Sequence, residues 1–231
     1  GIFESRDGGA NWKLLSTLDH PASKDWNDPA KQPPGHLGVS AITVEDTLVL
    51  PRIPRPNPAS SRARPVARIV PSYAGTEGAG VPIRRPFPGA LSMTDADPFV
   101  LLDHAGPTLN GPGEAKGAQW HPHRGFETVT YMLDGELAHR DTTGGGGVIA
   151  EGETQWMTAG SGIQHEELPT EQLYKNGGLF QAVQLWVNLP PALKMTTPRY
   201  QSITRGALRL LTSDDGGALI RLIAGDIAGF T

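Results

Sequence analysis

The chain has 231 residues, of which 19% are charged, with 29 glycines, 21 prolines and no cysteine. This length allows one or two domains with buried cores, and the glycine and proline content favours turn-rich β structure over a helical bundle. The formal net charge of -4 gives no electrostatic reason to expect nucleic acid as a partner, and the missing cysteines exclude disulfides, thiolate zinc sites and iron–sulfur clusters. No apolar run approaches the roughly 20 residues of a membrane span. The absence of cysteine fits a reducing cytosol, so we expect a cytoplasmic protein.

The first sixty residues differ in character from the rest. Residues 5–12, SRDGGANW, resemble the Asp-box SxDxGxxW of sialidase-like β-propeller repeats, in which the aspartate caps a tight turn. One repeat cannot build a propeller, because each blade buries its faces against its neighbours. We therefore expect residues 1–50 to be a propeller-like remnant with no assigned function. The Pro- and Arg-rich residues 51–66 predict a solvated linker, and without interleaved aromatics they do not indicate a nucleic-acid site.

From Ala67 onward, short β-like runs alternate with turn residues. Asp134-Gly135 is a two-residue hairpin signal, Gly144–Gly147 predict another hairpin loop, and residues 168–176 predict a short helical turn. Strands at intervals of about 8–12 residues predict an antiparallel sandwich or barrel. The last residues, IAGFT, read as the start of a new β unit, so we expect a fragment at both ends. The expected strands are 99–104, 127–133, 136–141, 154–158, 181–189, 207–211 and 218–223.

Two short motifs have the spacing of metal ligands. Residues two apart in an extended strand point to the same face, so His121 and His123 are expected to direct two imidazoles at one point. His165 and Glu167 have the same spacing. On neighbouring strands, the two pairs would offer three nitrogens and one oxygen to one ion and leave coordination positions open for catalysis. A lone HxH pair is more often structural, but a second pair about forty residues later favours a site.

Other residues near these motifs have supporting roles in this interpretation. Trp120, Trp156 and Met157 precede the two pairs and are expected to form an apolar wall that keeps water from the metal. His104 and His139 have no partner at ligand spacing, so we expect them in the core or behind the ligands.

The two motifs also resemble a known family. Residues 121–141, HPHRGFETVTYMLDGELAHRD, and 152–169, GETQWMTAGSGIQHEELP, resemble the pirin signature within the cupin superfamily, and segments 78–89 and 97–107 match its preceding strands in order. The resemblance implies an all-β fold with a jelly-roll-like antiparallel cupin barrel. That barrel is expected over residues 67–178, and the start of a second, incomplete cupin domain over 179–231.

In this resemblance, His121, His123, His165 and Glu167 fall on the four metal positions of the family. The implied ion is Fe(II), with Mn, Co, Ni and Cu as alternatives. Many other cupins take their carboxylate from the first motif, so Glu127 is the second candidate for the fourth ligand, or it lies behind the ligands.

The resemblance implies two functions from different classes. Some pirins resemble quercetin 2,3-dioxygenases, which implies an enzyme that cleaves a flavonol such as quercetin with O2, with Glu167 taking the proton of the 3-hydroxyl. The alternative is an iron-binding, redox-responsive cofactor of a transcription regulator that has no turnover. The lack of a basic docking surface favours the enzyme. Its expected partners are then a small aromatic substrate and O2, without direct contact with nucleic acid or a membrane.

Overall fold

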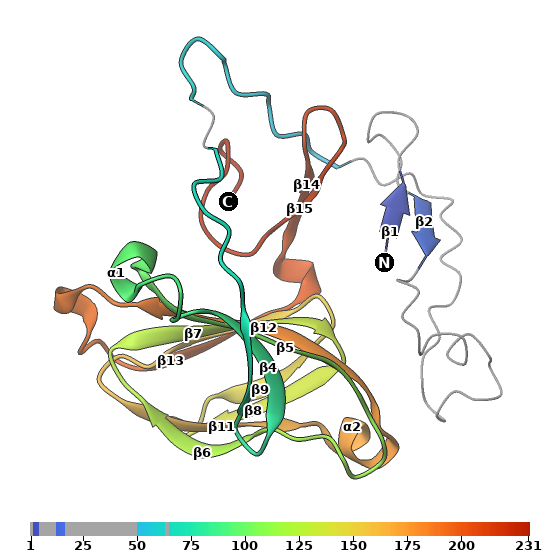
Figure 1. Cartoon of the computed structure of the whole chain (residues 1–231), viewed down its shortest axis with the longest axis vertical. Coiled ribbons are helices and arrows are strands. Elements are labelled where there is room, and N and C mark those ends of the chain that lie inside the picture. The colour runs from blue at the N-terminus through green and yellow to red at the C-terminus, as the bar shows by residue number, and fades with distance from the viewer. Residues whose placement is uncertain (1, 5–12, 17–49, 63–64) are drawn as a thin grey trace. The chain divides into compact units, whose positions relative to one another are not determined.

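The structure is a computed structural model that describes residues 2–4, 13–16, 50–62 and 65–231 (Figure 1). The chain divides into two compact units, one formed by residues 1–64 together with 208–231, the other by residues 65–207. The Asp-box-like segment lies outside the described residues. None of the helices in the described ranges is long and apolar enough to cross a membrane.

The unit of residues 65–207 is built from two antiparallel sheets (Figure 1). The strands of the larger sheet are β3 (Tyr73–Glu77), β4 (Val81–Phe87), β5 (Phe99–Asn110), β7 (Phe126–Asp134), β10 (Thr154–Thr158), β12 (Gly178–Asn188) and β13 (Arg199–Ile203). They pair in the order β13-β10-β7-β12-β5-β4-β3. The smaller sheet contains β6 (Ala118–His123), β8 (Glu136–Asp141), β9 (Gly146–Ala150) and β11 (Ile163–Pro169), in the order β6-β11-β8-β9. The helices of this unit are α1 (Met93–Ala96), α2 (Glu171–Asn176) and the 3-10 turns Pro191–Leu193 and Arg205–Ala207.

The main hydrophobic core joins the two sheets. Met132 and Phe180 come from the larger sheet, and Leu137 and Ile149 come from the smaller one. Because successive residues of a strand face opposite sides, each sheet directs alternate apolar side chains at the other. Met132 and Ile149 are fully buried. The predicted all-β antiparallel barrel is confirmed.

The hairpin predicted at Asp134-Gly135 is wrong. In the part of the chain that the structure describes, β7 pairs with β10 and β12, whereas β8 pairs with β9 and β11. Gly135 has a φ of +81°, and a Cβ there would lie 2.4 Å from the carbonyl oxygen of Leu179. The glycine thus permits a sharp bend by which the chain leaves one sheet for the other. The hairpin predicted around Gly144–Gly147 is confirmed, since β8 and β9 pair directly.

The structural boundary differs from the one expected after residue 178. Strand β12 pairs along its length with β5 and β7, so the barrel unit continues through β13 to Ala207. The chain beyond forms the two-stranded sheet of β14 (Arg209–Thr212) and β15 (Leu219–Leu222).

The expected linker is attached to that two-stranded sheet at its beginning. The Ile53 backbone N–H donates to the Thr212 carbonyl oxygen at 2.8 Å, and Arg55 forms an ion pair with Asp214 at 3.2 Å. Residues 51–55 are therefore not a free spacer, although most of the segment is exposed. Strands β1 (Ile2–Glu4) and β2 (Lys13–Ser16) form a separate antiparallel pair.

Candidate metal centre

Three predicted ligands meet where β6 pairs with β11. His121 lies directly opposite His165, and His123 opposite Ile163. The ring centroids of the three histidines are 4.3–4.8 Å apart, and their nearest donor nitrogens lie within 4.8 Å of one another. The i, i+2 spacing places both β6 histidines on one face, and strand pairing supplies the third.

Burial lowers the pKa of two of these imidazoles, His123 and His165, and so favours their neutral form. The pKa of His165 is lowered to about 2, first by burial and then by the neighbouring imidazoles. The pKa of His123 is lowered to about 4 by burial and by His121. The Nδ1 atom of His121 lies 2.6 Å from the Gln119 carbonyl oxygen, which only accepts, so Nδ1 carries a proton, and in the neutral ring Nε2 keeps the lone pair. Neutral imidazoles with free lone pairs are the form that binds metals.

The buried Nε2 of His165 is the observation that tests whether a metal ion fits this site. His165 has no exposed surface, and this nitrogen has no hydrogen-bond partner. An unsatisfied buried polar atom costs about 1–3 kcal/mol, and a metal ion held by the three imidazoles would remove that cost. The residues present therefore fit a transition metal that accepts imidazole ligands, such as Fe(II).

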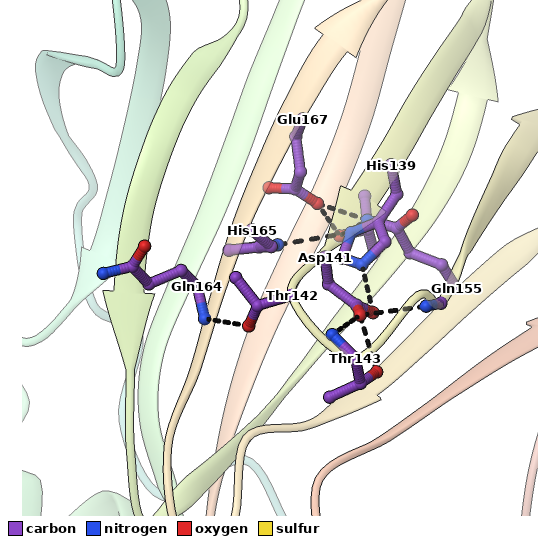
Figure 2. Close-up of polar contacts among 10 residues, drawn as sticks. His139, Asp141, Thr142, Thr143, Gln155, Gln164, His165 and Glu167 are labelled. Atoms are coloured by element: carbon purple, nitrogen blue, oxygen red, sulfur yellow. Dashed lines mark hydrogen bonds and ion pairs between the residues drawn. The ribbon is translucent and has the colours of Figure 1, made fainter.

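Glu167 lies beside His165, in a different group of donors. Its carboxylate, with donor atoms of His165 and His139, forms a second set within 4.8 Å. The Gln155 amide donates to Oε1, and the Gln184 amide donates to Oε2 at 2.9 Å (Figure 2 shows Gln155 and Glu167). Among the described residues, the four predicted ligands therefore form two overlapping groups that share His165.

The other candidate carboxylates point elsewhere. Glu127 lies on β7 in the larger sheet and accepts a hydrogen bond from the Thr158 hydroxyl at 2.6 Å, and it belongs to neither group. Glu166, which lies between His165 and Glu167 in the sequence, pairs with Arg140 on the opposite face of the smaller sheet, because successive residues of a strand alternate between faces. His104 lies 2.7 Å from the amide of Gln181 and also belongs to neither group.

The aromatic wall is formed by residues that the sequence analysis did not select. Trp120 is 50% exposed and cannot close the site. Instead, Phe126 and Trp186 stack at 4.6 Å between centroids, and each contacts the ring of His123 at about 5 Å. These residues, with Thr142 and Gln164, line a groove of about 760 Å³ that reaches His123. Trp186 comes from β12, and no sequence signal shows that this strand faces the β6 motif.

The barrel unit is similar in sequence to known proteins. Residues 80–187 match the family model described as Pirin. A Pseudomonas aeruginosa protein, whose name assigns it provisionally as a quercetin 2,3-dioxygenase, is 46% identical over 149 residues, which cover 64% of this chain and 52% of that protein. A Caulobacter vibrioides pirin-like protein is 42% identical over 167 residues, which cover 70% of this chain and 56% of that protein.

A solved structure shows the same fold. A crystal structure of quercetin 2,3-dioxygenase from Acinetobacter baumannii matches with a TM-score of 0.62 at 42% identity, covering 70% of this chain and 56% of that chain. The unit of residues 65–207 is thus a cupin-type barrel, as predicted. The chain spans about half the length of the curated relatives it matches. The Asp-box resemblance remains a prediction.

Proposed function

Because residues 80–187 match the pirin family of cupin barrels, we propose that this protein is an Fe(II)-dependent dioxygenase that cleaves a flavonol, such as quercetin, with O2. The ion would be held by His121, His123, His165 and Glu167. One observation supports the proposal most: three imidazoles converge beside an aromatic groove, and one presents a buried nitrogen without a partner. The same donors also suit Mn, Co, Ni and Cu.

The groove suits a planar aromatic substrate. Its volume of about 760 Å³ lies within the common range for small-molecule sites, about 300–1,000 Å³. The stacked rings of Phe126 and Trp186 offer flat apolar surface against which a flavonol can lie, and this surface ends at His123. The wall would orient the substrate and keep water away from its reacting ring.

Iron bound at this site would supply a Lewis acid for the flavonol hydroxyl and electrons for O2. The protein's part is to position the substrate and to accept its proton. Glu167 suits that role through Oε2, which accepts one hydrogen bond, from Gln184, and keeps a second lone pair, whereas Oε1 accepts from Gln155 and from the Thr130 hydroxyl. Gln184 also accepts a hydrogen bond from the indole N–H of Trp186 at 2.9 Å, so one chain of contacts links the aromatic wall to the proposed base.

Quercetin turnover by reconstituted protein tests this proposal. Protein loaded anaerobically with Fe(II) is mixed with quercetin and O2, and quercetin absorbance and released carbon monoxide are followed. We expect loss of quercetin with equimolar carbon monoxide. Protein loaded with Zn(II), which accepts the same ligands but has no redox chemistry, is the control and should be inactive. Full iron occupancy without quercetin loss would contradict the dioxygenase and leave metal binding intact.

A further inference from the structure

A hydrogen-bonded chain runs from the smaller sheet's β8 to the proposed ligand His165 (Figure 2). The Nδ1 atoms of His139 and His165 are 3.2 Å apart, and His139 Nε2 lies 3.2 Å from Asp141 Oδ2. Strands β8 and β11 are neighbours in which His165 lies opposite Asp141 and Glu167 opposite His139. All four side chains therefore share one face of the sheet.

The carboxylate of Asp141 defines one end of this chain. Its Oδ1 accepts hydrogen bonds from the Thr143 backbone N–H, the Thr143 hydroxyl and the Gly145 N–H, at 2.6–3.0 Å. Burial alone would raise the pKa of Asp141, but the hydrogen bonds from Thr143, His139 and Gly145 outweigh it and lower that pKa. Oδ2 is thus a carboxylate acceptor directed at His139.

The positions of the protons follow from that acceptor. A carboxylate can only accept, so a neutral His139 ring donates from Nε2 and holds a lone pair on Nδ1. This lone pair faces Nδ1 of His165, which must be the donor of that contact. The Nε2 atom of His165 is left without a proton, and it is the buried nitrogen that has no partner.

We propose that His139 is a positioning residue: held by Asp141, it accepts the Nδ1 proton of His165 and keeps the Nε2 lone pair of His165 free for the metal. The inference rests on the proposed metal site and adds to it the residues that fix one ligand's tautomer. Packing supports the role, because His139 is only 1% exposed and stacks on the ring of Tyr200, with centroids 4.5 Å apart at 18°.

A competing role must be separated from this one. A ring nitrogen of His139 lies within 4.8 Å of a ring nitrogen of His165 and of a carboxylate oxygen of Glu167, so His139 could itself be a ligand. A ligand and a positioning residue respond differently to substitution. Loss of a ligand changes the metal's coordination, whereas loss of a positioning residue weakens binding by about 10–100-fold at unchanged coordination.

The test uses Co(II) as the probe, with affinity measured by chelator competition and coordination by the visible spectrum. His139→Phe keeps the stacking on Tyr200 but offers no acceptor, and we expect binding about 10–100-fold weaker with the wild-type spectrum at saturation. His139→Gln should restore affinity to within a few-fold, because its amide can accept from His165 and donate to Asp141. His121→Ala, which removes a proposed ligand, is the reference for loss of the site.

A second variant tests the proton order itself. In Asp141→Asn, the three donors around Oδ1 hold the amide oxygen there, so the amide NH2 faces His139 and reverses both tautomers. Nitrogen NMR of the metal-free protein should then show the His165 proton on Nε2, whereas the wild type carries it on Nδ1. This readout also serves if His139→Phe does not fold.

The outcomes are distinct. If His139→Phe binds Co(II) weakly with an altered spectrum, and His139→Gln does not restore the affinity, then His139 is a ligand and the inference is overturned. Wild-type affinity in His139→Phe, or an unchanged His165 tautomer in Asp141→Asn, would also overturn it. Full Co(II) affinity in His121→Ala would instead refute the proposed metal site.

Discussion

The two candidate glutamates for the fourth ligand, Glu167 and Glu127, occupy different environments. Glu167 is 7% exposed and its carboxylate is held by two amides beside His165, whereas Glu127 belongs to the larger sheet and is engaged by Thr158. A base must reach both the substrate and the metal site. The position of Glu167 next to His165 supports it as the proposed fourth ligand and base.

Replacing each glutamate by glutamine should therefore have unequal effects. Glutamine is nearly isosteric but cannot take the substrate's proton, so Glu167→Gln should lower flavonol turnover by about a hundred- to ten-thousand-fold. Glu127→Gln, the matched control, should cost roughly ten- to a hundred-fold at most. Metal content and turnover of both variants are measured under the same conditions. Loss of metal from Glu127→Gln with retention in Glu167→Gln would transfer the carboxylate role to Glu127.

Individual residues also show how far sequence reasoning reaches. The HxH spacing predicts a shared face for His121 and His123, and the structure brings His165 to them. The same reasoning misses Trp186, because strand parity says nothing about which distant strand will lie opposite. It treats His139 only as a core or supporting residue, because its partners lie two residues along its own strand and on the neighbouring β11.

At the scale of elements, the bend between β7 and β8 depends on Gly135. Gly135 and Gly144 have the same φ of +81°, but an added Cβ at Gly135 meets the Leu179 carbonyl oxygen at 2.4 Å, while one at Gly144 meets nothing within 4 Å. An alanine at either position would therefore have the same backbone strain, but only an alanine at Gly135 would also clash with the Leu179 carbonyl oxygen.

Alanine at the two positions separates these effects. Gly144→Ala should lower the free energy of unfolding by about 1–2 kcal/mol, the cost of a left-handed alanine. Gly135→Ala should lower it by at least a further ~1 kcal/mol, because backbone must shift to relieve the contact. Chemical denaturation of both variants measures the difference. Equal losses would show that the bend does not require the close approach to Leu179.

The failed hairpin prediction has a physical reason. Asp-Gly specifies a tight reversal of the backbone, a local property that the sequence encodes well. It does not specify the sheet that the next strand joins, which depends on long-range pairing with β9 and β11. Strands with strong alternation are predicted within a few residues, as for β8 and β10, whereas sheet order is not accessible from one sequence.

At the scale of the whole molecule, both groups of metal donors lie in the unit of residues 65–207. Deleting residues 1–60 should thus leave metal stoichiometry unchanged, since in this scheme none of them supplies a ligand. The contacts of residues 52–55 with the β14 segment would be lost, so the melting temperature of the remainder is measured alongside metal content. A truncated protein that folds normally but no longer holds metal would contradict this assignment of the site.

The central claim is that one metal centre is assembled from the paired strands β6 and β11. The number of tightly bound Fe(II) ions per chain, determined by elemental mass spectrometry after anaerobic loading and desalting, tests it most directly. The wild type should hold one ion per chain. His121→Ala and His165→Ala should each hold essentially none while keeping the β-sheet circular dichroism, because the apolar core between the sheets does not include these side chains. A wild type without metal, or either variant with one full equivalent, would contradict the account.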